Sequence, residues 1–179
     1  MFYLFLADGF EETEALAPLD MMRRAKIEVK TVGVTGEFVT GSHGVTVKAD
    51  LKPEEIPFNN IDGVVLPGGM PGTVNLGKSE TVTKAAVYCA ENGKITAAIC
   101  AAPSVLGNLG ILKGKKATCF PGFEKELEGA TYTAAPVEID GNVITGKGAG
   151  CAILFGKAIV EKAVSAEAAN KVCGDMQCP

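Results

Sequence analysis

The sequence predicts an α/β fold in which helices cover both faces of a mostly parallel sheet. Short apolar runs alternate with stretches whose apolar residues recur at helical spacing, and this order is typical of βαβ units. The 179 residues are 47% hydrophobic, which is enough for a full core without disulfides. No repeat, linker or low-complexity segment interrupts the pattern. We therefore expect residues 1–179 to form a single domain.

Four apolar runs are predicted to be strands, and they are residues 1–6, 27–34, 63–66 and 94–99. Between the first two, the apolar residues at positions 15, 19 and 22 predict a helix over about 12–25. Between the last two, the apolar residues at positions 82, 85, 86 and 89 predict a second helix, which Asn92-Gly93 would end.

Two strand pairs and two further helices complete the expected elements. Residues 38–49 contain the turn-rich segment Thr40-Gly41-Ser42-His43-Gly44 and predict a strand pair outside the parallel order. Asp140-Gly141 predicts a hairpin over 137–145. The last helices are expected over about 152–163 and 165–173, the second with Ser165 as its N-cap.

The charge pattern excludes some partners. The formal net charge is −4, and no cluster of basic residues is longer than Lys115-Lys116, so nucleic acid is not an expected partner. The apolar start, residues 1–7, lacks a basic flank and is far shorter than the ~20 residues of a membrane span. We interpret it as a buried strand and expect a cytoplasmic protein without a membrane partner.

The functional site is expected at the carboxyl edge of the sheet, where loops and helix N-termini converge in open parallel α/β folds. Four segments rich in small residues leave predicted strands at that edge. They are residues 8–14, 67–72, 100–103 and 146–150.

Cys100 is the strongest candidate for a reactive residue in these segments. It ends an apolar strand and shortly precedes Pro103, so its thiol is predicted to lie on a sharp strand-to-helix turn. Backbone N–H groups and the helix dipole at such a turn favour a thiolate and a lowered pKa. The alternative is a buried, inert cysteine.

Glu14 is the second candidate. Acidic residues in the first turn of a helix complement its dipole, and this explanation suffices for Glu11 and Glu12. Glu14 could instead share a proton with the sulfur of Cys100, because a carboxyl held near an anion has a raised pKa and becomes a donor.

Backbone donors are expected beside the same thiol. The N–H groups of the Gly68-Gly69 turn, together with that of Ala101, could bind a developing oxyanion, and a plain tight turn is the alternative. Gly146-x-Gly148-x-Gly150 lacks the spacing of a dinucleotide loop, so no nucleotide or other cofactor is expected.

The six cysteines are expected to be free thiols, because no secretion signal accompanies them. Zinc spacing is absent, since four residues separate the closest pair, Cys173 and Cys178, and His43 is the only histidine. We interpret that pair as part of a disordered tail, with a metal site as the alternative, and His43 as a turn or interface residue.

The motifs of these segments resemble those of the ThiJ/PfpI superfamily, specifically its DJ-1-like branch. The resemblance runs in order from about residue 2 to residue 165. The motifs are Asp8-Gly9-Phe10-Glu11-Glu12-Thr13-Glu14, Val65-Leu66-Pro67-Gly68-Gly69, Ala97-Ala98-Ile99-Cys100-Ala101-Ala102-Pro103 and Gly148-Ala149-Gly150.

The resemblance implies a flavodoxin-like three-layer sandwich, a homodimer and a nucleophile-elbow cysteine that oxidises readily to the sulfinate. By these motifs Cys100 would be that cysteine, Glu14 its hydrogen-bonding carboxyl, and Gly69 with Ala101 the backbone donors. Protease-like members place a histidine where this chain has Ala101, so their Cys-His dyad is absent. Some DJ-1-like proteins have a histidine before a proline where this chain has Phe120, which implies a more apolar pocket without a general-base imidazole.

Three functions are compatible with these residues. The resemblance favours a cofactor-free enzyme of the glyoxalase or deglycase type that acts on small 2-oxoaldehydes in stress defence, without metal or glutathione. A non-enzymatic redox sensor or holdase chaperone that responds to oxidation of Cys100 is the alternative. A peptidase or amidase is disfavoured by Ala101 and Phe120.

Overall fold

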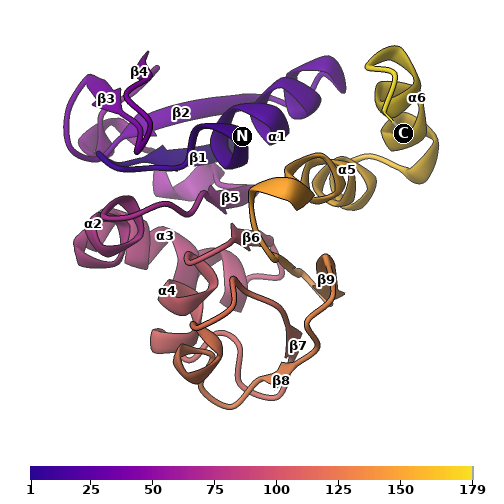
Figure 1. Ribbon diagram of the computed structural model, residues 1–179. Helices are drawn as coiled ribbons and strands as arrows, with labels where there is room; N and C mark the ends of the chain where they lie inside the picture. The colour runs from indigo at the N-terminus through magenta and orange to yellow at the C-terminus, as the bar shows by residue number, and fades with distance from the viewer. Residues whose placement is uncertain (179) are drawn as a thin grey trace.

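A six-stranded sheet runs through the centre of the protein in the order β2-β1-β5-β6-β10-β9 (Figure 1). The computed structural model describes residues 1–178. The first five strands of that order are parallel, and only β9 at the edge runs antiparallel to its neighbour. The mostly parallel sheet predicted from the sequence is thus confirmed. The strands are β1 (Phe2–Leu6), β2 (Val29–Gly33), β5 (Gly63–Leu66), β6 (Ile95–Ile99), β9 (Val137–Asp140) and β10 (Val143–Gly146).

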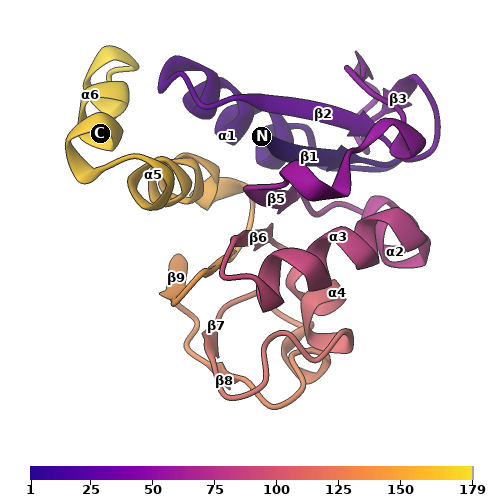
Figure 2. The same ribbon diagram turned by 180° about the vertical axis from the view of Figure 1, so that it is seen from behind.

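Helices lie on both sides of this sheet (Figures 1 and 2). One side carries α1 (Glu12–Arg24), α5 (Ala152–Ala163) and α6 (Ala166–Asp175), and the other carries α2 (Gly72–Lys78), α3 (Glu80–Glu91) and α4 (Pro103–Asn108). Strand β1 shows why both faces are apolar. Phe2 and Leu4 pack into the core under α1 and α5, whereas Tyr3 and Phe5 pack into the core under α3, because successive side chains of a strand point to opposite faces.

The contact between α1 and α5 is close because Gly156 has no side chain. A Cβ at this position would lie 2.6 Å from the sulfur of Met21 and 3.0 Å from the Cα of Pro18. The buried contact holds α1 against the sheet, and α1 carries the carboxylates of the candidate site.

The smaller elements match the sequence in part. Residues 38–49 form a separate antiparallel pair, β3 (Phe38–Thr40) and β4 (Thr46–Lys48), and the hairpin at Asp140-Gly141 is present, so both predictions are confirmed. Helix α2 and the short parallel pair β7 (Lys116–Ala117) and β8 (Thr131–Tyr132) were not predicted. Single 3₁₀ turns lie at Pro53–Glu55, Phe58–Asn60, Glu124–Glu126 and Ala149–Cys151.

Helix α6 includes Cys173, and Cys178 is held by a backbone hydrogen bond in the turn that follows the helix, so the prediction of a disordered tail at Cys173 and Cys178 is wrong. Ser165 is the N-cap of α6 as predicted, and its hydroxyl accepts a hydrogen bond of 3.1 Å from the N–H of Ala168. The helix reaches Asp175 because Ala169 and Val172 bury one face of it against the core. Within residues 1–178, no helix combines the length and the apolar character needed to span a membrane.

Candidate active site

Four loops meet at the carboxyl edge of the sheet, as the sequence predicts, because they leave four adjacent parallel strands, β1, β5, β6 and β10. The N–H of Glu11 donates to the carbonyl of Gly68 at 3.0 Å, which joins the loops after β1 and β5. The N–H of Cys100 donates to the carbonyl of Gly146 at 2.9 Å, which joins the loops after β6 and β10. All four predicted segments therefore contribute to one place.

Cys100 lies on the predicted sharp turn between β6 and α4. Its φ is +66°, in the left-handed region that a residue with a side chain rarely occupies. Its carbonyl accepts a hydrogen bond of 2.8 Å from the N–H of Phe120, and Pro103 begins α4 three residues later. Backbone bonds on both sides of Cys100 hold this strained conformation and leave the side chain half-buried.

Glu14 is held beneath the thiol by its own helix and by the loop after β5. The carboxylate of Glu11 caps α1 and accepts a hydrogen bond of 2.7 Å from the N–H of Glu14. Glu14 is 1% exposed, and its carboxylate accepts a hydrogen bond of 2.9 Å from the N–H of Gly68. A Cβ at Gly68 would lie 2.6 Å from Oε2 of Glu14 and 2.7 Å from Cβ of Cys100, so the two side chains are neighbours.

The surroundings of Cys100 raise the pKa of its thiol, whereas the sequence predicted a lowered one. Burial and then the charge of Glu14 raise the pKa of Cys100 to about 12, and they outweigh the opposing N–H groups of Ala101 and Gly69. Burial, assisted by the charge of Glu11, raises the pKa of Glu14 to about 7, against the opposing hydrogen bonds of Cys100 and Gly68. Near neutral pH the thiol therefore faces a carboxyl that is poised between its two protonation states.

Two glycines, Gly68 and Gly69, let the loop after β5 approach the site of Glu14 and Cys100. Gly69 has a φ of +89°, and a Cβ there would lie 2.4 Å from the N of Glu11, so only glycine fits. The N–H groups of Gly69 and Ala101 lower the pKa of the Cys100 thiol. The N–H of Gly68, which the sequence also offered for an oxyanion, binds Glu14 instead.

Phe120 forms an apolar edge beside these loops. Its side chain is 48% exposed, and a Cβ at Gly148 would lie 3.3 Å from its ring. Its N–H holds the carbonyl of Cys100, a positioning contact that the sequence alone did not reveal.

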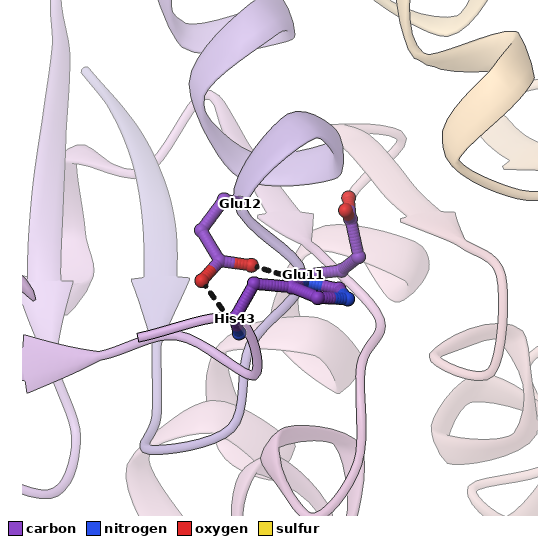
Figure 3. Close-up of side chains that lie close together, drawn as sticks. All are labelled: Glu11, Glu12 and His43. Carbon is purple, nitrogen blue, oxygen red and sulfur yellow. Dashed lines mark hydrogen bonds and ion pairs between the residues drawn. The ribbon is translucent and has the colours of Figure 1, made fainter. Parts of the chain in front are cut away.

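Glu12 attaches the β3–β4 loop to the start of α1 (Figure 3). Its carboxylate accepts hydrogen bonds from the N–H groups of His43, at 2.8 Å, and Val45, at 3.3 Å, and lies 2.9 Å from Nδ1 of His43. Although burial alone would raise the pKa of Glu12, these bonds lower it to about 2, and the carboxylate raises the pKa of His43. The dipole explanation for Glu12 is therefore incomplete.

The same corner brings ligand atoms of Glu11, Glu12 and His43 within 4.8 Å of one another. Each carboxylate already has a structural partner, because Glu11 caps α1 and Glu12 binds the β3–β4 loop. These hydrogen bonds account for the arrangement without a metal ion.

Comparison with known proteins agrees with the family resemblance of the sequence motifs. A model of the DJ-1/PfpI family matches residues 2–162. The chain is 35% identical over 172 residues to protein dj-1beta of Drosophila melanogaster, covering 94% of this chain and 92% of that protein. The crystal structure of Drosophila DJ-1beta superposes with a TM-score of 0.93 and 33% identity, over 99% of this chain and 97% of that one.

Two further relatives are a longer plant protein and an archaeal protein that is named for an activity. Protein DJ-1 homolog B of Arabidopsis thaliana is 39% identical over 174 residues, which are 96% of this chain but only 40% of that protein. A protein of Thermococcus kodakarensis named a deglycase is 36% identical over 144 residues, 79% of this chain and 86% of that one. The agreement in sequence and in flavodoxin-like fold shows that this chain belongs to the DJ-1/PfpI family.

Proposed function

We propose that this protein is a cofactor-independent enzyme of the glyoxalase or deglycase type, which converts small 2-oxoaldehydes by means of Cys100. The observation that carries the proposal is the meeting of a thiol, a buried carboxyl and two backbone N–H donors at one point of the sheet edge. The archaeal relative that is named a deglycase supports the same chemical class.

The first step is addition of the thiol to the aldehyde. The sulfur of Cys100 forms a bond to the aldehyde carbon while the carboxylate of Glu14 accepts the thiol proton. The electron pair of the carbonyl moves to its oxygen, which the N–H groups of Gly69 and Ala101 would stabilise. Glu14 then returns the proton to that oxygen, so a free thiolate is not needed at rest.

The second step is proton transfer between the two carbons. The Glu14 carboxylate takes the hydrogen of the former aldehyde carbon as a proton and delivers it to the neighbouring carbonyl carbon, while the proton of the new hydroxyl passes to the oxygen of that neighbouring carbonyl. The former aldehyde carbon thereby becomes the carbonyl of a 2-hydroxy acid thioester on Cys100. Water cleaves this thioester and restores the thiol. The sum is oxoaldehyde plus water to 2-hydroxy acid, with no external oxidant or reductant, and a carboxyl with a pKa of about 7 suits proton transfer near neutrality.

The test is methylglyoxal consumption and lactate formation by the reduced protein without glutathione. We expect turnover by the intact protein and by Cys178→Ser, a thiol outside the site, and at least about a 100-fold loss in Cys100→Ser, because the nucleophile is removed. No turnover by the intact protein would overturn the proposal and favour the redox sensor or chaperone.

We also propose that the protein acts as a homodimer, as the family resemblance implies. Exposed apolar side chains of the β3–β4 region, Phe38 at 62% and Val45 at 49%, support association of two copies. Light scattering coupled to size-exclusion chromatography is expected to give twice the 18.5 kDa of one chain, and a monomer mass at micromolar concentration would contradict the dimer.

A further inference from the structure

The last turn of α6 brings two cysteines together. Met176 is the C-cap of the helix, and Gln177 after it has a φ of +56°, in the left-handed region. The N–H of Gln177 donates to the carbonyl of Gly174 at 3.1 Å, and the N–H of Cys178 donates to the carbonyl of Cys173 at 2.9 Å. This pair of bonds is the Schellman motif, in which the chain turns back over the end of the helix.

The motif places particular side chains in contact. The residue after the left-handed position and the third residue before the C-cap usually form a hydrophobic contact. Here both positions are cysteines, Cys178 and Cys173; both are half-buried, and Cys178 raises the pKa of Cys173. By contrast, Cys89 and Cys119 are completely buried.

We propose that Cys173 and Cys178 are a redox-active pair that forms an intramolecular disulfide with low-molecular-weight disulfides such as glutathione disulfide. One cysteine attacks a sulfur of the oxidant, breaks its S–S bond and releases one thiol. The second cysteine attacks the resulting mixed disulfide and releases the second thiol. Two electrons pass from the cysteines to the oxidant, and their two protons end on the released thiols.

The backbone favours the second of these steps. A disulfide requires Cα atoms within about 7 Å and Cβ atoms that face each other. The 2.9 Å hydrogen bond between the two cysteines already holds their backbones together, so ring closure needs little more than side-chain rotation. Attack within the chain then competes well with a second external thiol, because the two groups are preorganised.

The pair is a separate thiol centre from Cys100. Helix α6 supplies no residue to the candidate active site. The charged side chain that acts on Cys173 is Lys157 of α5. A positive charge there stabilises the thiolate that must form for exchange, although burial and Cys178 raise the pKa of Cys173 overall. We therefore expect exchange to be faster at pH 8 than at pH 7.

The experiment treats the reduced, folded full chain with glutathione disulfide at pH 8, then unfolds it in urea at low pH, alkylates the remaining thiols and maps peptides without reduction. We expect a disulfide between residues 173 and 178, a mass loss of about 2 Da and four of the six thiols still alkylated. Cys151→Ser is the matched control, since it removes another half-buried thiol and should leave the disulfide unchanged.

The single variants test the pairing. Cys173→Ser and Cys178→Ser should each lose the internal disulfide and carry one glutathione on the remaining cysteine. Stable glutathione adducts on both cysteines of the intact protein, a disulfide in another pair, or no reaction under conditions that oxidise the urea-unfolded chain would overturn the proposal.

Discussion

A single proton between Cys100 and Glu14 determines the chemistry available to this site. Both groups are deprived of water, and each raises the cost of charge on the other, so the pair favours one negative charge rather than two. The Gly68 N–H binds the carboxylate of Glu14, and the Gly69 and Ala101 N–H groups lower the pKa of the thiol. The reactivity of Cys100 therefore depends on the acceptor for its proton.

Replacement of Glu14 tests whether the pKa of Cys100 depends on this carboxyl. Glu14→Gln removes the charge but keeps a hydrogen-bonding amide, so the pKa of Cys100 should fall below its value in the intact protein. Glu14→Leu removes the charge and the donor, and its thiol pKa should lie above that of the Gln variant. The pH dependence of Cys100 alkylation, read by peptide mass spectrometry, gives both values. Equal values in the two variants would exclude the hydrogen bond, and the exposed Glu161→Gln serves as control.

Gly69 offers a second test at a single residue. Gly69→Ala should reduce stability by about 1–3 kcal/mol and displace the N–H that faces Cys100, because the new Cβ meets backbone atoms in a left-handed conformation. Gly174→Ala is the matched control, since its Cβ would meet nothing within 4 Å. Urea unfolding and methylglyoxal turnover measure the two effects. An alanine variant as stable and active as the intact protein would show that the turn does not need glycine.

At the scale of elements, the first turn of α1 organises the site. Three carboxylates follow one another there, and each has a different partner: Glu11 caps the helix, Glu12 binds the β3–β4 loop, and Glu14 contacts the thiol. Gly41 allows the loop to approach, because a Cβ there would lie 2.4 Å from the Glu12 carboxylate. The placement of the helix and that of the loop are therefore linked.

The Glu12–His43 contact predicts a pH-dependent loop. The lowered pKa of Glu12, about 2, means that its contribution is present above its ordinary pKa of 4.5 and is lost as pH falls toward 2. The raised pKa of His43 means that its contribution is complete below 6.5 and is lost as pH rises through the raised value. Hydrogen-exchange protection of residues 41–46 should thus be greatest at about pH 5–6. His43→Ala should remove the decline at higher pH, and an unchanged decline would contradict the ion pair.

At the scale of the whole molecule, the order of the strands creates the site. Residues separated by up to about 86 positions meet because β1, β5 and β6 are neighbours and parallel, so their carboxyl ends share one edge. The two cores on either side of the sheet hold these ends in register. Burial of the Glu14 carboxyl costs free energy of unfolding, and the packing of these two cores offsets that cost.

That cost should appear in the pH dependence of unfolding. The pKa of Glu14 is raised from 4.5 to about 7 in the folded protein, so its favourable contribution is complete below pH 4.5 and is lost as pH rises through 7. Glu14→Gln should therefore gain stability relative to the intact protein between pH 5 and pH 8.5, by up to about 3 kcal/mol. Urea unfolding at both pH values measures the gain. An equal difference at the two values would mean that Glu14 does not titrate in this range.

The sequence predicted most of the large elements. The strands, α1, α3, α5 and α6 carry regular apolar spacing, and turn residues such as Asp140-Gly141 mark their ends. Helix α2 was missed because its short, glycine-containing segment lacks that spacing, and its burial arises only from contacts with the rest of the fold. The Schellman turn after α6 was missed because Gln177, not glycine, occupies its left-handed position.

The sequence by itself determined the fold class and the family, because apolar periodicity and motif order are properties of the chain, and it proposed Cys100, Glu14, Gly69 and Ala101 as the site. The tertiary structure decided the burial that raises the pKa of Cys100, which N–H binds Glu14, and that Cys173 meets Cys178. These features depend on burial and on distances between segments, and such quantities exist only after the sheet and helices have packed together.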